Sequence, residues 1–435
     1  MVSISPYLGA PVEAEPDPPR QKLGRSARLS IAVLGLSALV LFGAVAASAV
    51  ASSNGRTAAN FYAVPDAPSG SSPGKLLYSL PADSSQLPNS TDWKVAYVSR
   101  DAKGQPDVVT GTVAVPTGAW RGPGPRPIVD YAVGTQGLGT TCAPSKSFDS
   151  GLEYEDPNIN SALQAGYAVV VTDYQWSGTT GTPLPTYEVG KSEGHAVLDI
   201  ASASTQLQGA GLTTSAPVVV WGYSQGGGAA IWAGQQWPAY APGVDLVGVA
   251  AGGVPGDLPT VGAALDGGFA SGILLDTFIG FHSAYPDLPF TSLLNEAGKT
   301  AVNTIESQCV LGNLVSYGSA KTTSLTVGGL TFQQLLAQGN WKADLLANSP
   351  GQPGAHIATP VFNYRGTTDE VVPVAVEDAI YANLCATGTT VQSATYAGED
   401  VLSNFEAQGD VIRFIADRVA HRPGVNSCTT DPHTL

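Results

Sequence analysis

Two kinds of hydrophobic pattern alternate along the chain from residue 94 to 251 and return from 356 to 428. Short apolar or β-branched runs, bounded by Gly, Pro, Asn or Asp, predict strands at 94–99, 107–116, 127–133, 167–173, 218–221, 244–251, 360–366 and 390–396. Longer stretches with apolar positions at helical spacing predict helices at 159–165, 193–207 and 406–419, and two more that end at Trp237 and Ala386. Because strands and helices alternate, the pattern predicts an α/β fold, with a mostly parallel sheet that carries helices on both faces.

The alternation stops between residues 252 and 355. There, apolar, helix-like pieces are joined by Gly, Ser and Pro turns, at 261–281, 293–305 and 332–338. This stretch separates two predicted core strands, so we interpret it as a cap inserted into the α/β core. The core then consists of residues 94–251 and 356–428, with an extended segment at 52–93 before it and a short tail at 429–435 after it.

The N-terminal region has the pattern of a targeting segment. Residues 1–28 are rich in proline and end with four basic residues, and the predominantly apolar stretch 29–51 follows. Small residues offer A-x-A sites for cleavage after Ala49 or Ala51. This order is typical of a secretory signal peptide and predicts a secreted protein. An uncleaved, extracytoplasmic membrane anchor is the alternative, because about 18 apolar residues just span a bilayer.

Charge and cysteine content narrow the class of protein. The 435 residues include 20 Lys and Arg against 35 Asp and Glu, a formal net charge of −15. With no basic patch to neutralise phosphates, nucleic acid is excluded as a partner. Neither the four cysteines nor the five scattered histidines have the spacing of metal ligands, so we expect no metal and no cofactor. An even number of cysteines in an exported chain predicts two disulfide bonds, and the sequence alone allows three pairings.

The strongest chemical signal is Gly-Tyr-Ser-Gln-Gly at 222–226, which follows a β-branched run and precedes a helix-like segment. G-x-S-x-G between a strand and a helix is the pattern of a nucleophile elbow, a sharp turn in which both glycines avoid a clash between the two backbones. We expect this turn to present the Ser224 hydroxyl above the sheet edge. It also places the N–H of Gln225 at a helix N-terminus, where an oxyanion is stabilised. The bare pattern also arises by chance in a glycine-rich chain. The prediction of an elbow therefore depends on the predicted strand before the motif and the predicted helix after it.

Acyl transfer by a serine needs a base that accepts the hydroxyl proton and a carboxylate that orients this base. Asp369 follows the predicted strand 360–366, which is where folds of this kind carry the triad acid. The alternative is a loop aspartate that caps the next helix.

Several ordered motifs together resemble those of the secretory lipase family, the relatives of fungal lipase A. Besides the elbow they lie at 134–145, 173–175, 193–199, 285–288 and 366–373. The resemblance extends from residue 61 to residue 428, which is nearly all of the expected mature chain. It implies an α/β-hydrolase fold with a helical cap, and hydrolysis of acylglycerols or simple esters.

The resemblance also implies roles for individual residues. Ser224 is the nucleophile and Asp369 the triad acid. The second oxyanion donor falls on Thr135 or Gln136, beside the N–H of Gln225. A cap with many apolar residues suits a lipid-facing lid, and an ordinary helical subdomain is the alternative. The disulfide pairs that the resemblance implies are Cys142 with Cys309 and Cys385 with Cys428.

The chain departs from the family at the catalytic base. The family's histidine lies in the loop after the last strand, where this chain has Asp400. A carboxylate beside Asp369 has too low a pKa and would repel it, so Asp400 does not replace an imidazole. His282 in the cap and His195 at the start of a helix are the candidate substitutes.

Two hypotheses for the function follow. The first is an exported serine carboxyl-ester hydrolase, lipase-like, that forms an acyl-enzyme on Ser224 and takes a lipid or small ester as its substrate. The second is a catalytically impaired lipase homologue that binds lipid or a protein partner. Retention of Ser224, the elbow glycines and Asp369 favours the hydrolase, whereas Asp400 favours the homologue. Either protein would associate with a membrane if the N-terminal apolar segment is retained.

Overall fold

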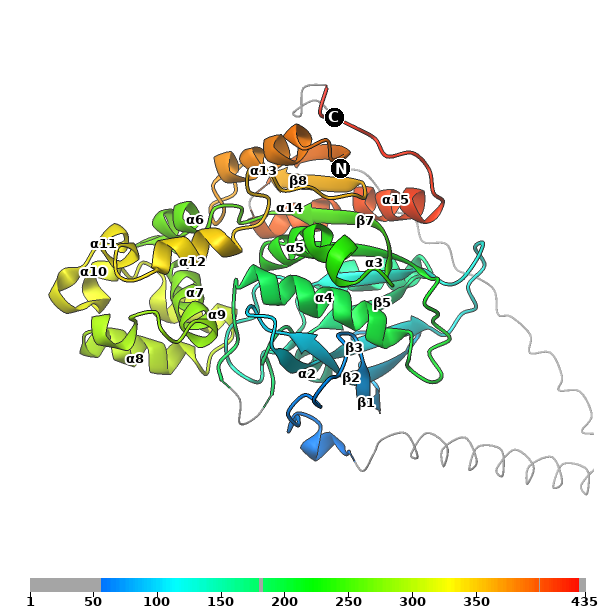
Figure 1. Ribbon diagram of the computed structural model, residues 1–435, viewed down its shortest axis with the longest axis horizontal. Coiled ribbons are helices and arrows are strands. Elements are labelled where there is room, and N and C mark those ends of the chain that lie inside the picture. Colours follow the sequence, from blue (N-terminus) through cyan, green and yellow to red (C-terminus); the bar gives the residue numbers. More distant parts are fainter. Residues whose placement is uncertain (1–55, 180–182, 399, 430–435) are drawn as a thin grey trace, which may run out of the picture. The chain divides into compact units, whose positions relative to one another are not determined.

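The computed structural model describes residues 56–179, 183–398 and 400–429. Within these residues the chain forms one sheet in the order β1-β2-β3-β5-β4-β6-β7-β8-β9 (Figure 1). The strands are β1 (Leu76–Ala82), β2 (Ser90–Arg100), β3 (Pro106–Pro116), β4 (Ile128–Ala132), β5 (Ala168–Thr172), β6 (Pro217–Tyr223), β7 (Asp245–Gly252), β8 (Val361–Gly366) and β9 (Val391–Tyr396). The pairs β1–β2, β2–β3 and β3–β5 are antiparallel, and every pair from β5 through β9 is parallel. The predicted α/β fold with a mostly parallel sheet is therefore confirmed.

Helices cover both faces of this sheet. The core helices are α2 (Pro144–Ser150), α3 (Asp156–Gln164), α4 (Gly190–Ser204), α5 (Gln225–Tyr240), α13 (Val374–Ala386), α14 (Asp400–Glu406) and α15 (Gln408–Val419), and a short turn η1 (Ala58–Asn60) precedes β1. Along β7, Gly248 faces Phe414 of α15, and the next residue, Val249, faces Gly234 of α5. Because neighbouring residues of a strand point to opposite faces, α5 and α15 lie on opposite sides of the sheet.

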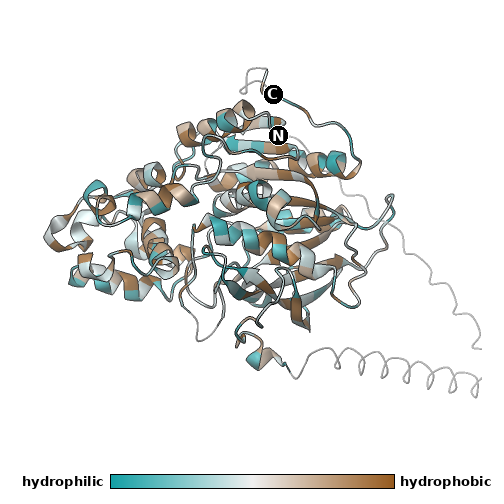
Figure 2. Cartoon of the chain, in the orientation of Figure 1, coloured by the Kyte–Doolittle hydropathy of each residue, from teal (hydrophilic) through white to brown (hydrophobic). Residues whose placement is uncertain are grey.

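The segment between β7 and β8 consists of helices joined by loops, and most of its apolar side chains belong to one hydrophobic cluster. Its helices are α6 (Leu258–Leu265), α7 (Ser271–Ala284), η2 (Thr291–Leu293), α8 (Glu296–Ile305), α9 (Val310–Tyr317), α10 (Thr322–Leu325), η3 (Val327–Gly329), α11 (Phe332–Leu336) and α12 (Trp341–Asn348). Phe278 lies at the centre, with Phe332 and Trp341 against its ring. The cluster also includes Tyr187 and Val371 from the core, so core and cap share one apolar contact surface. Figure 2 shows hydrophobic residues along both the strands and the cap helices.

Three sequence-based expectations for the elements need correction. The helix that was expected to end at Trp237 continues through Pro238 to Tyr240, because a proline in the last turn leaves only one hydrogen bond of that turn unmade. The apolar piece 261–281 is two helices, α6 and α7, separated by Gly267 and Gly268. Strand β1 lies inside the segment that was expected to be extended and was not predicted as a strand, and it pairs with β2.

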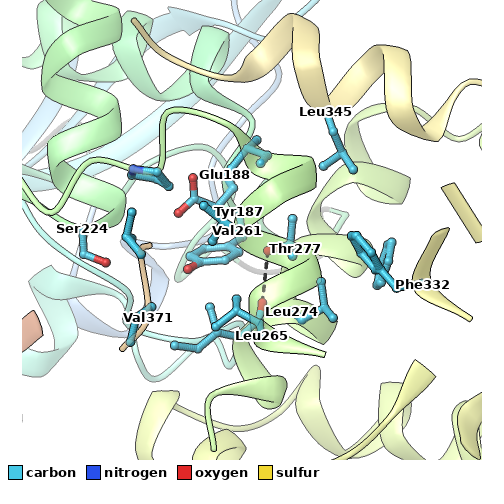
Figure 3. Close-up of a pocket in the computed structure, with 16 residues that line it drawn as sticks. Tyr187, Glu188, Ser224, Val261, Leu265, Leu274, Thr277, Phe332, Leu345 and Val371 are labelled. Carbon is cyan, nitrogen blue, oxygen red and sulfur yellow. Dashed lines mark hydrogen bonds between the residues drawn. The ribbon is translucent and has the colours of Figure 1, made fainter. Parts of the chain in front are cut away.

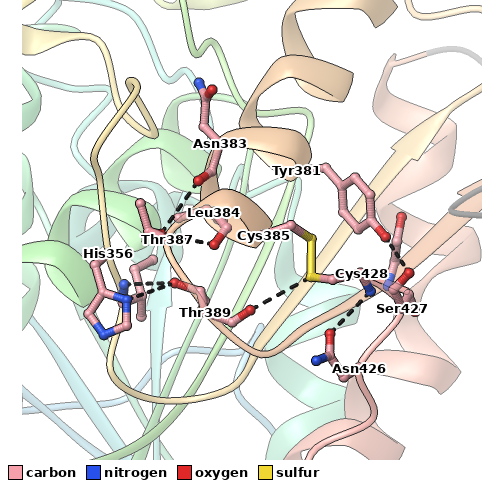
Figure 4. The surroundings of a disulfide bond; sticks show 12 residues. His356, Tyr381, Asn383, Leu384, Cys385, Thr387, Thr389, Asn426, Ser427 and Cys428 are labelled. Atoms are coloured by element: carbon pink, nitrogen blue, oxygen red, sulfur yellow. Dashed lines mark hydrogen bonds between the residues drawn. A yellow bond between two sulfur atoms is a disulfide. The ribbon is translucent and has the colours of Figure 1, made fainter. Parts of the chain in front are cut away.

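Two disulfide bonds join Cys142 to Cys309 and Cys385 to Cys428, as the family resemblance implied. The first ties the loop after β4 to the start of α9 in the cap. The second ties the last turn of α13 to the C-terminal segment, where the Tyr381 hydroxyl donates to the Ser427 carbonyl oxygen at 2.6 Å (Figure 4).

We expect the Cys142–Cys309 bond to contribute more stability than the Cys385–Cys428 bond. It closes a loop of 167 residues, against 43 for the second. The loop-closure entropy predicts a difference of about 1 kcal/mol in the free energy of unfolding, within a typical total of about 2–5 kcal/mol per bond. Denaturant unfolding of the two paired Cys→Ala variants measures this difference. An equal loss for both variants would contradict the loop-closure account.

Candidate active site

Ser224 occupies the turn between β6 and α5 with φ 55° and ψ −123°, a backbone conformation that non-glycine residues rarely adopt. The two flanking glycines are required by close backbone contacts. A Cβ on Gly222 would lie 2.2 Å from the Gly226 carbonyl oxygen, and one on Gly226 would lie 1.9 Å from the Ala132 carbonyl oxygen. The Ser224 N–H donates to the Gly252 carbonyl oxygen at 3.0 Å and holds the turn on β7. This is the geometry of a nucleophile elbow.

Ser224 lines a mostly apolar cavity that lies between the core loops and the cap (Figure 3). Half of the residues in its wall come from α6 and α7, and the core supplies Ser224, the loop before α4 and the loop after β8. The polar side chains in the wall besides Ser224 are those of Tyr187, Glu188 and Thr277. The apolar lining residues are Pro255, Leu258, Val261, Leu265, Ile273, Leu274, Phe278, Phe332, Leu345, Val371 and Val372. A cavity with such a lining binds an apolar ligand rather than a charged one beside Ser224.

The N–H of Gln225 is the first of α5, where backbone N–H groups have no partner within the helix and the helix dipole favours negative charge. The Gln225 side chain donates to Glu193 Oε1 at 2.7 Å. This contact holds the residue after the nucleophile against α4. The N–H of Gln225 is therefore fixed as a donor beside Ser224.

The second predicted oxyanion element, the loop 134–137, directly follows β4. The Thr135 hydroxyl bonds the Tyr187 hydroxyl at 2.6 Å, and the Gln136 carbonyl accepts from the Val310 N–H of the cap at 2.9 Å. Gln136 and Gln225 both line a second cavity of about 360 Å³, and Tyr187 belongs to the walls of both cavities. The structure thus brings the loop next to Gln225 and ties it to the cap.

Buried Glu155 holds this loop from behind. Its Oε2 accepts from the Gly134 N–H at 2.6 Å, and its Oε1 accepts from Asn404 Nδ2 of α14 at 2.8 Å. Burial raises the pKa of Glu155 to about 7, while these hydrogen bonds oppose the rise. The loop after β4 and the helix after β9 are therefore linked through one carboxyl group.

Asp369 lies in the loop after β8, as predicted, and is 9% exposed. Its Oδ1 accepts from the N–H groups of Val371 at 2.9 Å and Val372 at 2.7 Å. Both valines line the cavity that holds Ser224. Asp369 itself is not among the residues that line the cavity, and its contacts hold the loop that carries the two valines.

The two histidines that were considered as substitute bases, His195 and His282, are not in the wall of this cavity. His195 Nδ1 lies 3.3 Å from the Arg100 carbonyl oxygen, and its ring stacks on Tyr240 at 4.1 Å. His282, in the last turn of α7, packs on the ring of Phe290 at 5.3 Å. Of the histidines within the described ranges, none lines the cavity around Ser224.

Asp400, which was predicted to stand at the family's histidine position, is the first residue of α14. Its side chain and the whole of residue 399 lie outside the described part of the chain. The next side chain, Val401, is 48% exposed.

A pair of buried acids at this site was not predicted from the sequence. Glu188 is 7% exposed and Glu193 1% exposed, and the Glu188 N–H donates to Glu193 Oε1 at 3.0 Å. Burial raises the pKa of Glu193 to about 8. Burial and the neighbouring Glu193 charge raise that of Glu188 well above its ordinary value, although a hydrogen bond from Tyr187 opposes this. The signal that could have indicated Glu188 is its position as an acidic residue at the end of the long loop before the helix predicted at 193–207.

Over the described residues, no group of three or more His, Cys, Asp or Glu side chains could hold a metal ion.

This chain is similar in sequence to known lipases. A profile of the family named Secretory lipase matches residues 143–427. Lipase 9 of Candida albicans is 29% identical over 77% of this chain and 75% of its own length. Secreted triacylglycerol lipase LIP7 of Malassezia globosa is 28% identical over 66% of this chain and 63% of its own length.

Solved structures agree on the fold. Candida antarctica lipase A in its closed state superposes with a TM-score of 0.76 at 24% identity, over 86% of this chain and 89% of that chain. The rice cell wall degrading esterase LipA from Xanthomonas oryzae superposes with a TM-score of 0.66 at 17% identity, over 81% of this chain and 99% of that chain. The sheet, the elbow and the inserted cap are therefore those of an α/β hydrolase, and the chain belongs to the secretory lipase family.

Proposed function

We propose that this protein hydrolyses carboxyl esters of lipids through an acyl-enzyme on Ser224. The observation that carries the proposal is a nucleophile-elbow serine that lines a mostly apolar cavity. Membership of the secretory lipase family supports the ester as the reacting group. The relative from Malassezia globosa, a triacylglycerol lipase by name, supports acylglycerols as the substrate class.

The reaction follows from the site. Ser224 Oγ attacks the ester carbonyl carbon, and the negative charge that develops on the carbonyl oxygen lies at the N-terminus of α5, within reach of the Gln225 N–H. A second donor comes from the loop 134–137, at Thr135 or Gln136. The acyl chain lies along α6 and α7. The alcohol leaves when the C–O bond breaks, and water then releases the acid from Ser224.

We further propose that the protein acts outside the cytoplasm, with residues 29–51 as its export signal. Membership of a secretory family supports export. Residues 29–51 lie outside the described residues, and among the described helices none is long and apolar enough to cross a bilayer. N-terminal sequencing of the exported protein distinguishes the two forms: a new N-terminus at about residue 50 or 52 indicates a cleaved signal, and an intact one indicates an anchor.

Release of fatty acid from emulsified triacylglycerol, and of nitrophenol from esters of increasing chain length, tests the proposed function. We expect turnover that depends on Ser224 and is retained for long acyl chains, because the wall of the cavity is mostly apolar. Absence of Ser224-dependent turnover at every chain length would contradict it. A gain of turnover in Asp400→His in that case would identify an impaired lipase homologue.

Val261→Trp is expected to shorten the acyl chains that the enzyme accepts. Val261 is 6% exposed and lines the cavity, so a larger side chain occupies space that the distal methylenes would fill. Each excluded methylene costs about 0.8 kcal/mol of binding, or ~4-fold. The ratio of kcat/KM for long to short esters should therefore fall ~50-fold or more. The matched control is Val315→Trp on α9, where the side chain is 87% exposed and the ratio should not change. An unchanged ratio in Val261→Trp would place the acyl chain elsewhere.

A further inference from the structure

Among the described residues, Glu188 is the one carboxylate that lines the cavity around Ser224. Of the described residues that line it, Tyr187 and Glu188 are the only ones with titratable side chains. Asp369, His195 and His282 are not among the residues that line it. The group that accepts the Ser224 proton must reach the cavity, because Ser224 lines it.

The loop before α4 holds Glu188 in a specific conformation. Its φ is 59°, a left-handed backbone value that costs free energy for a glutamate. Its N–H is fixed on Glu193 Oε1 at 3.0 Å, and the same oxygen accepts from the Gln225 side chain at 2.7 Å. The residue after the nucleophile and the backbone of Glu188 are therefore joined through one atom.

Ser224 and Glu188 both line this cavity. In Figure 3 the Glu188 carboxylate lies on the side of its residue that faces Ser224, with another lining side chain drawn between the two. We propose that Glu188 is the general base of Ser224 and stands in for the histidine that the family's triad would supply. This inference rests on the proposed ester hydrolysis.

The proton balance is complete with Glu188 alone. In acylation the Glu188 carboxylate takes the proton of Ser224 Oγ as the Oγ–carbon bond forms, and gives it to the alcohol oxygen as the ester C–O bond breaks. In deacylation Glu188 takes a proton from the attacking water and returns it to Ser224 Oγ as the acyl–Oγ bond breaks. No co-reactant besides water is required.

Burial makes a carboxylate competent for this role. An ordinary glutamate is too weak a base near neutral pH, but loss of solvation raises the pKa of Glu188, and the charge of Glu193 raises it further. The groups that face Glu188 are Tyr187 on its own loop and Glu193 on α4, while the cap side of the cavity is uncharged. Since Glu188 acts as the carboxylate, kcat/KM should rise with pH through this elevated pKa and then level off.

The experiment compares the wild type with Ser224→Ala, Glu188→Gln and Glu377→Gln. Glu377 is also buried, at 2% exposure, but does not line the cavity, so its variant is a matched control. The readouts are kcat/KM against pH and the rate at which an alkyl fluorophosphonate inactivates the enzyme at Ser224. We expect Glu188→Gln to lower both by ~100-fold or more and to remove the rise with pH. Glu377→Gln should stay within ~2-fold of the wild type.

The outcomes separate the two proposals. Wild-type rates and pH profile in Glu188→Gln, with Ser224→Ala inactive, overturn the role of Glu188 and leave the hydrolase intact. A wild type without Ser224-dependent turnover overturns the proposed function and this inference with it. If Glu188→Gln does not fold, Glu188→Asp decides: it keeps a carboxylate that is withdrawn by one methylene, so a reduced rate with the pH-dependent rise retained supports the role, and an unchanged rate overturns it.

Discussion

Ser224→Ala is expected to lower ester hydrolysis by up to about a millionfold, because the acyl group then has no oxygen to which it can bond. The oxyanion donors and the apolar cavity remain, so a small rate above that of water persists. The substitution removes only Oγ. Since alanine occupies the same backbone turn, the thermal midpoint should change by no more than a few degrees.

The measurement pairs kcat/KM on a long-chain nitrophenyl ester with a thermal melt of the same preparation. Loss of activity with an unchanged melt supports Ser224 as the nucleophile. Turnover within tenfold of the wild type would show that another residue carries the reaction.

Gly226→Ala is expected to damage both the stability and the activity. Its Cβ would lie 1.9 Å from the carbonyl oxygen and 2.7 Å from the carbonyl carbon of Ala132, and both are backbone atoms that cannot rotate away. The first turn of α5 must then move away from β4, and the Gln225 N–H moves with it. Overpacking of this kind costs about 3 kcal/mol. A displacement of about 1 Å at the reacting atoms costs ~100-fold in rate.

Gly243→Ala is the matched control, because a Cβ there meets nothing within 4 Å. Its free energy of unfolding and its kcat/KM should both equal those of the wild type within error. A Gly226→Ala protein as stable and active as Gly243→Ala would contradict the elbow geometry.

The core of this fold could be predicted because its local signals agree. Strands such as β4 and β6 are buried along their whole length, so they appear in the sequence as continuous apolar runs. Strand β1 was missed because its half-buried pattern is weak and its pairing with β2 is a tertiary contact. The split of 261–281 into α6 and α7 was missed because helical periodicity alone does not mark a break.

The site was predictable only where a motif carries its own backbone geometry. The elbow around Ser224 is such a motif, because its glycines are required by contacts between adjacent elements. Glu188 was not found, since its place in the cavity depends on its own left-handed backbone, on a partner five positions later and on a cap whose first lining residue, Pro255, lies 67 residues further along the chain. Loops of this kind acquire their role only through tertiary packing.

The most direct test of the account is covalent labelling of the folded protein with a long-chain alkyl fluorophosphonate, followed by peptide mass spectrometry. We expect one labelled residue, Ser224, and we expect a competing long-chain ester to slow its labelling. Failure to label Ser224, with label absent or on another residue, would contradict the claim that the elbow serine is the activated nucleophile of a lipid-binding cavity.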